Sequence, residues 1–150
     1  ILVQYDWACK EGEFPNKDSK YFENMTRVIF QAGLNWKVIT MKWPDFKEAF
    51  ADFDIDKVTA FDDTDVARLM ENKAIVRNEA KIKATILNAQ VFHDIATTHG
   101  SFHTYLKNLL ANQDLNQIMK TLQKQFNRLG KTSAHIYLWS VGVKVPHREH

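Results

Sequence analysis

The stretch Phe30-Gln31-Ala32-Gly33-Leu34-Asn35-Trp36 indicates the end of one helix, a tight turn and the start of a second helix. Gly33 can adopt the positive φ that closes a helix, and the Asn35 side chain can cap the next one. Trp36 then falls in a first helical turn, beside backbone N–H groups that lack partners within the helix. A flat π-face beside free donors suits a flat base or a phosphate group. The alternative is a tryptophan that only packs a helix corner.

Apolar residues at helical spacing extend from this stretch in both directions. We expect a first helix that Asp18 or Ser19 caps and that Gly33 ends, with an apolar inner face (Tyr21, Phe22, Met25, Val28, Ile29). We expect a short helix over residues 36–41 and another that begins at Pro44 and runs to Phe50. Phe46, Phe50 and Phe53 are predicted core residues.

Cap residues and helical spacing predict further helices towards the C-terminus. Asp56 is expected to cap a short turn, and Thr64 is expected to cap a helix over 65–71. Asn78 is expected to cap the longest helix, over 79–99, and Ser101 the next one, over 102–110. Asp114 precedes a helix over 115–129, and the last predicted helix covers 132–141. No run alternates as a strand does. The sequence therefore predicts one all-α domain over residues 1–150, a compact array of seven to nine helices.

The composition is that of an ordinary globular protein. Lys and Arg number 20 and Asp and Glu 18, so the net charge of +2 is slight, and any contact with nucleic acid must come from local patches and helix ends. Cys9 is the only cysteine, which excludes an intrachain disulfide. No apolar run has the length of a membrane span, and no secretory signal opens the chain. We expect a cytoplasmic monomer that does not bind membranes.

A second informative stretch runs from Phe126 to Ala134, where an apolar helix ends at Leu129-Gly130 and a new helix begins. Free N–H groups at that helix start, together with Lys131, predict a phosphate site over Gly130, Lys131 and Thr132. The alternative is a plain corner between two helices. A basic cluster at Arg77, Lys81 and Lys83 is typical of a solvated face.

The sequence predicts no metal site and no cofactor. The six histidines are scattered, and His99 and His103 straddle a glycine instead of sharing a helix face. No nucleophile triad, phosphate-binding glycine loop or pair of catalytic carboxylates stands out. The catalytic group, if there is one, is therefore not assigned from the sequence.

Three blocks resemble the DNA-3-methyladenine glycosylase I family, within the helix–hairpin–helix superfamily of DNA glycosylases. They are Asp18-Ser19-Lys20 leading to Gln31–Trp36, the block from Ala74 to Ile82, and Leu122 to Gly142 with its hairpin at Leu129-Gly130. The resemblance covers the chain from Trp7 to about His147. It implies an enzyme of base-excision repair that flips an N3-alkylated purine, 3-methyladenine, out of duplex DNA and excises it, because the target bond is out of reach inside the stack.

The resemblance also implies roles for individual residues. Trp36 matches a tryptophan that stacks on the base, and Trp7 matches a second pocket aromatic, so the two rings are expected to sandwich the base. The turn Ala32-Gly33-Leu34 matches the turn pressed into the gap left by the flipped base, and N–H groups near Gly130 to Thr132 match a phosphate site. A cationic ring would be attracted to the π-face of Trp36.

This chain departs from the family pattern in its pocket and its zinc site. Val28 stands where the family has a pocket glutamate, and Tyr5 stands where it has a zinc cysteine. His147 matches one zinc ligand, and a single ligand holds no zinc. Three functions therefore stay open: a zinc-free alkylbase glycosylase, a DNA-binding module that senses damage without cutting, and a scaffold that holds another aromatic ligand.

Overall fold

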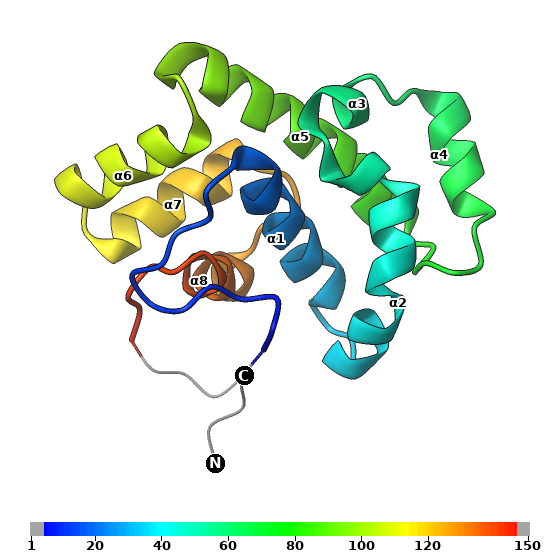
Figure 1. The fold of residues 1–150 in the computed structure, drawn as a ribbon, viewed down its shortest axis with the longest axis horizontal. Coiled ribbons are helices and arrows are strands. Elements are labelled where there is room, and N and C mark those ends of the chain that lie inside the picture. The colour runs from blue at the N-terminus through cyan, green and yellow to red at the C-terminus, as the bar shows by residue number, and fades with distance from the viewer. Residues whose placement is uncertain (1–4, 147–150) are drawn as a thin grey trace.

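The computed structural model describes residues 5–146, and within this range the chain forms eight α-helices, one short 3-10 helix and no strand (Figure 1). The elements in order are α1 (Asp18–Gln31), α2 (Trp36–Ala49), η1 (Ala51–Phe53), α3 (Ile55–Thr59), α4 (Asp63–Met70), α5 (Glu79–His99), α6 (Phe102–Asn112), α7 (Leu115–Gln125) and α8 (Lys131–Ser140). The predicted all-α fold is confirmed. None of these helices has both the length and the apolar character that a membrane crossing needs.

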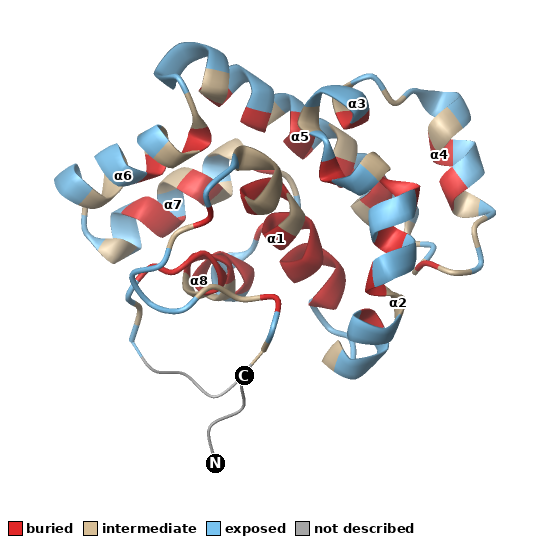
Figure 2. Cartoon of the chain, in the orientation of Figure 1, coloured by how far each residue is buried: buried red, intermediate tan, exposed pale blue. Residues whose placement is uncertain are grey.

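Helix α1 lies at the centre of the fold and packs against α2, α5, α6 and α8. Figure 2 shows it buried along most of its length. Its predicted apolar face is buried as expected, with every member at most 2% exposed: Tyr21, Phe22, Met25, Val28 and Ile29. Full burial of each such side chain stabilises the fold by about 1.5–3 kcal/mol. The C-terminal turn of α1 is therefore a fixed support for the loop that follows it.

A cluster of aromatic rings explains why α2 is one helix. The sequence predicts a break before Pro44, and this is wrong, because α2 continues through the proline. Trp43 stacks on Phe46 and on Phe53, with ring centroids 5.0 and 5.4 Å apart. Phe46, Phe50 and Phe53 are fully buried, as predicted. An interior proline costs a helix about 3 kcal/mol, which burial of the flanking rings offsets.

The predicted helix caps Asn78 and Ser101 are confirmed, because each side chain accepts a hydrogen bond from the backbone N–H three residues later. Asp114, predicted only to precede its helix, caps α7 in the same way. Two others are wrong by a few residues, because Asp54 caps α3 in place of Asp56, and Asp62 caps α4 in place of Thr64.

Asp18 does not cap its own helix. Its carboxylate accepts the backbone N–H groups of Phe102 and His103, at 2.7 and 3.3 Å, so it ties the start of α1 to the start of α6. Lys17 occupies the N-cap position of α1 and makes no side-chain bond there. The Phe102 N–H, which binds the Asp18 carboxylate in place of a donor in α1, lies 84 residues away. Local sequence patterns do not indicate a contact over that separation.

Helix α7 is four residues shorter than predicted, since Phe126 already has an extended backbone (φ −105°, ψ 151°). Its ring packs against Phe92 and Phe102, with centroids 4.9 and 6.1 Å apart, and this contact holds the chain out of the helix. Arg128 follows with a positive φ of 63°, and α8 then begins at Lys131, one residue before the predicted start. The predicted change of direction between two helices is therefore present at this point.

Candidate base-binding site

The turn between α1 and α2 has the predicted geometry. Gly33 has φ +77°, and the Leu34 N–H donates to the Gln31 carbonyl at 2.9 Å. The Asn35 side chain accepts from the Lys37 N–H at 2.8 Å and caps α2. A Cβ on Gly33 would meet nothing within 4 Å, so the glycine is required for its backbone conformation and not for space. The turn Ala32-Gly33-Leu34 is exposed.

A cavity of about 370 Å³, here called the turn cavity, lies between this turn, the end of α1 and the start of α8. Its volume falls within the range of roughly 300–1,000 Å³ that small-molecule sites occupy. The residues that line it are Val28, Gln31, Ala32, Gly33, Leu34, Trp36, Thr132, Ser133 and Ile136. The structure thus brings together side chains more than 90 positions apart, including most of the site residues predicted from the sequence.

The two predicted pocket tryptophans do not face each other. The rings of Trp7 and Trp36 meet edge to face, with centroids 6.0 Å apart and an interplanar angle of 70°. A flat base can lie between two rings only when their faces are parallel, so the expected sandwich is wrong for this arrangement. Trp7 is 8% exposed and packs against Trp139 on its other side. Trp36 is half-buried and also contacts Tyr5, at 5.1 Å between centroids.

Trp7 instead lines a second cavity, also of about 370 Å³, between the N-terminal segment, α1 and α2. This cavity holds charged groups, among them Glu23, which accepts the indole N–H of Trp43 at 2.8 Å. The guanidinium of Arg27 lies over both indole rings, 4.9 Å from Trp7 and 5.1 Å from Trp43. Burial lowers the pKa of Arg27 to about 10, and the charge of Glu23 opposes that shift.

Arg27 connects this second cavity to the turn cavity. Its Nε–H donates to the Gln31 side-chain oxygen at 3.0 Å, and its Nη2 donates to the Thr40 hydroxyl at 2.8 Å. Arg27 is 4% exposed and Gln31 1% exposed. Neither residue was singled out from the sequence for chemistry, although Gln31 belongs to the stretch that organises the fold.

Lys81 in the first turns of α5 holds the α1–α2 turn from the other side. Its Nζ donates to the carbonyls of Phe30 and Ala32, at 3.3 and 3.1 Å. These carbonyls sit at the C-terminal end of α1, where a positive charge is favourable. Burial lowers the pKa of Lys81, and the charge of Arg128 adds to the effect. The interpretation of this lysine as part of a solvated face is therefore wrong.

Asn88, farther along α5, holds the turn before α8. Its side chain accepts the backbone N–H of Asn127 at 2.7 Å and donates to the Asn127 carbonyl at 3.2 Å. It is 1% exposed. One helix therefore fixes both turns that flank the turn cavity.

The start of α8 leaves donors without side-chain partners. Gly130 occupies the N-cap position and supplies no side-chain hydrogen bond. Lys131 and Thr132 are exposed, and Thr132 also lines the turn cavity. This geometry is suited to an anion held beside the cavity.

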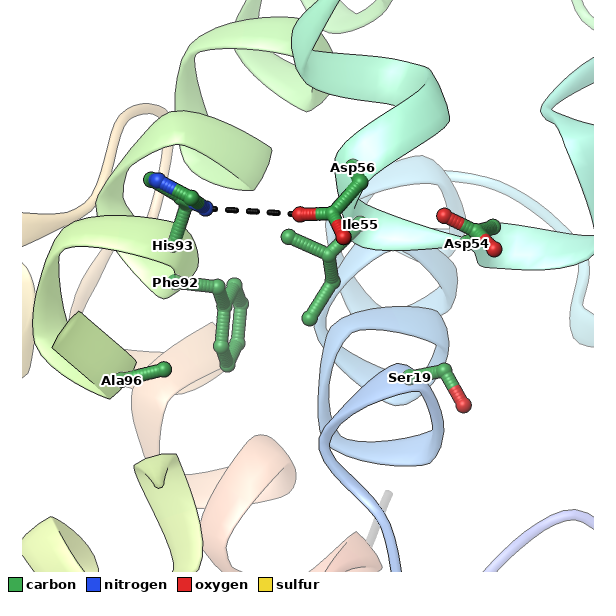
Figure 3. Close-up of a pocket in the computed structure, with 7 residues that line it drawn as sticks. All are labelled: Ser19, Asp54, Ile55, Asp56, Phe92, His93 and Ala96. Atoms are coloured by element: carbon green, nitrogen blue, oxygen red, sulfur yellow. Dashed lines mark ion pairs between the residues drawn. The ribbon is translucent and has the colours of Figure 1, made fainter. Parts of the chain in front are cut away.

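A third cavity, of about 270 Å³, lies at the other end of α1 (Figure 3). Figure 3 shows His93 and Asp56 pointing toward each other across it, with an Nδ1–Oδ1 distance of 3.4 Å. Asp54 and Asp56 give it an acidic wall. Ser19 lines it and lies about 18 Å along α1 from Gln31, at 1.5 Å per residue. Its carboxylates would repel a nucleic-acid backbone, so it is not the site of choice.

Among residues 5–146, no three side chains of the metal-ligating types lie close enough together to hold an ion. His147, which matches a zinc ligand of the family, lies outside the described residues. The predicted absence of a zinc site stays a prediction.

Comparisons with known proteins converge on one family. The model for the family described as methyladenine glycosylase matches residues 5–136. A DNA-3-methyladenine glycosylase of Haemophilus influenzae is 24% identical over 164 residues, covering 97% of this chain and 89% of that protein. DNA-3-methyladenine glycosylase 1 of Escherichia coli is 38% identical over 83 residues, covering 55% and 44% of the two chains.

A solved structure supports the same assignment. The 3-methyladenine DNA glycosylase I of Staphylococcus aureus, solved to explain recognition of 3-methyladenine, has a TM-score of 0.79 and 25% identity to this chain. The match covers 91% of this chain and 82% of the other. Since the family model spans most of the sequence, this chain belongs to the methyladenine glycosylase family.

Proposed function

We propose that this protein is a DNA glycosylase of base-excision repair that removes N3-alkylated purines, 3-methyladenine above all, from duplex DNA, acting as a cytoplasmic monomer. The observation that carries the proposal is the turn cavity, which is lined by Trp36, by the exposed turn Ala32-Gly33-Leu34 and by the start of α8. Family membership and the relatives named DNA-3-methyladenine glycosylase support the same activity.

Each part of the turn cavity has a role in this proposal. The face of Trp36 stacks on the flipped base, and its quadrupole favours a cationic ring. The turn Ala32-Gly33-Leu34 fills the gap left in the duplex. The N–H groups at the start of α8, with Lys131, hold a backbone phosphate. Trp7 supports Trp36 from behind, through the edge contact between the two rings.

An N3-alkylated purine is a good leaving group because its ring is positively charged. A water oxygen bonds to the sugar C1′ while the bond from C1′ to the base nitrogen breaks. The electron pair of that bond neutralises the ring, and the water releases one proton. Recognition and exclusion of undamaged bases then need little acid–base chemistry from the protein, in line with a cavity that no carboxylate lines.

The direct test is release of free alkylated base from methylated duplex DNA, measured by mass spectrometry. Stacking of an aromatic side chain on a base contributes about 1–3 kcal/mol, so Trp36→Ala should lower the rate about 5- to 150-fold. Trp36→Phe should keep much of the activity. Met41→Ala, on the same helix and 81% exposed, is the matched control. If the wild type releases base no faster than buffer alone, the enzymatic proposal fails.

A second function, a damage-sensing module that binds DNA without cutting it, is favoured by Val28. This valine is 2% exposed and forms part of the wall of the turn cavity, so it offers an alkylated base no hydrogen bond. Such a module would bind methylated duplex DNA in a gel-shift assay, lose affinity steeply with added salt and release no base. Lys131→Ala should reduce the salt dependence of binding, because that side chain is exposed at the start of α8.

A further inference from the structure

A buried cation in the wall of the second cavity has no anionic partner. Arg27 lines this cavity and is 4% exposed. Burial lowers the pKa of its guanidinium to about 10, so the group stays charged at neutral pH. Within residues 5–146 the guanidinium forms no ion pair, although a buried charge without a counter-charge carries a large desolvation cost. An anion that enters the cavity would offset that cost.

The contacts that hold Arg27 leave part of its guanidinium available. One N–H on Nε binds the Gln31 side-chain oxygen at 3.0 Å, and one on Nη2 binds the Thr40 hydroxyl at 2.8 Å. The second N–H of Nη2 and both N–H groups of Nη1 have no partner within the described chain, and protein atoms do not seal Nη1 off from solvent. Nη1 therefore opens onto the second cavity, which Arg27 lines.

Two indole rings surround this charge without neutralising it. The guanidinium carbon lies 4.9 Å from the centroid of the Trp7 ring and 5.1 Å from that of Trp43. Cation–π contacts stabilise a desolvated cation, yet the rings carry no net charge. Together with the two hydrogen bonds, the rings hold the guanidinium in one orientation. A fixed, planar pair of N–H donors is what recognition of both oxygens of a carboxylate requires.

The charges around Arg27 favour a ligand with a single negative charge. The charged residues that line the cavity are three cations and two carboxylates: Lys20, Arg27, Lys47, Asp6 and Glu23. Their formal sum is therefore +1, which one carboxylate neutralises and which a phosphate group, with a charge of about −1.5 to −2 at pH 7, exceeds. Duplex DNA carries one negative charge per about 1.7 Å of its axis, so Asp6 and Glu23 would repel it.

The volume of about 370 Å³ leaves room for an organic body attached to the carboxylate. Tyr5, Trp7 and Trp43 supply aromatic surface in the cavity wall. We propose that the second cavity binds a small aromatic carboxylate, whose two oxygens accept N–H groups of the Arg27 guanidinium. None of the described residues lines both this cavity and the turn cavity, so the inference does not depend on the glycosylase function.

The test is an NMR titration of the full chain with sodium benzoate, in a buffer free of other carboxylates and at constant ionic strength. Benzamide, which has nearly the same shape and no charge, is the matched ligand. We expect saturable shifts of the Arg27 Nε–H and of the Trp7 and Trp43 indoles, and nuclear Overhauser contacts between those indoles and the benzoate ring. Benzoate should bind about tenfold more tightly than benzamide or better, the effect of a charge-assisted hydrogen bond.

Two variants separate the role of Arg27 from a general effect of charge. Arg27→Met removes the guanidinium and keeps a long side chain, so it should weaken benzoate binding about tenfold, to the level of benzamide. Arg77→Met removes a charge from an exposed position just before α5 and should leave the affinity for benzoate unchanged.

Inorganic phosphate and a short DNA duplex serve as competing anions. We expect each to bind this cavity more weakly than benzoate. Equal binding of benzoate and benzamide, or shifts confined to Trp36, would overturn the proposal. Phosphate that binds more tightly than benzoate, or a duplex that displaces benzoate, overturns the assignment to a small carboxylate. Because the contacts to Trp7 and Trp43 are measured in the wild type, the proposal stays testable even if Arg27→Met does not fold.

Discussion

Replacement of Asn88 by alanine should loosen the turn before α8 and destabilise the fold. The Asn88 side chain makes three hydrogen bonds with Asn127, two to its backbone and one to its side-chain amide. Each contributes about 0.5–1.5 kcal/mol, so we expect a loss of about 2–4 kcal/mol in the free energy of unfolding. For a chain of this length that corresponds to a fall of roughly 4–16 °C in Tm.

The assay is thermal and urea unfolding followed by circular dichroism, with base release measured on the same samples. Asn116→Ala is the matched control, because Asn116 is exposed on α7, and its effect should stay within about 0.5 kcal/mol. DNA binding by Asn88→Ala should weaken at temperatures where the protein is still folded, since the turn positions the start of α8. Equal stability of the two variants would refute the reasoning that Asn88 holds this turn.

Three further predictions address the turn and the core. Lys81→Met removes two hydrogen bonds to carbonyls of the α1–α2 turn and should cost about 1–3 kcal/mol in urea unfolding; no loss would mean that the turn holds without it. Gly33→Ala places an alanine at φ +77°, and its Cβ meets nothing within 4 Å. Backbone strain alone should therefore lower the free energy of unfolding by about 1–2 kcal/mol, measured by urea unfolding. Burial raises the pKa of Tyr21 and of Tyr137 above the ordinary value of 10. The folded chain therefore retains protons that the unfolded chain loses above pH 10, so Tm should fall as pH rises beyond 10, and less so in Tyr137→Phe.

Local signals in the sequence were enough to predict most helix boundaries. Asn35 and Asn78 each cap the helix that follows directly, and the reason lies within three residues of each. Asp18 was assigned to the wrong helix because its partners, the first N–H groups of α6, are far away in the sequence. Pro44 was given too much weight, because the aromatic packing that offsets its cost depends on tertiary contacts.

The candidate site was predicted in part. The resemblance placed Trp36 and Thr132 in the site, and both line the turn cavity. Trp7 was assigned to the same pocket, but in the folded chain its ring is turned edge-on to Trp36, which a sequence pattern does not reveal. Arg27 donates a hydrogen bond to the side-chain oxygen of Gln31. No spacing pattern in the sequence encodes which end of the Gln31 amide faces Arg27.

The central claim is that the turn cavity accepts an alkylated purine against Trp36. Its most direct test is a titration of the protein with free 3-methyladenine, followed by NMR of the indole and side-chain amide groups. The account predicts shifts of the Trp36 indole and of the Gln31 amide, with the Trp43 indole much less affected. Shifts confined to His93 and its neighbours in the third cavity, or no shift at all, would contradict it.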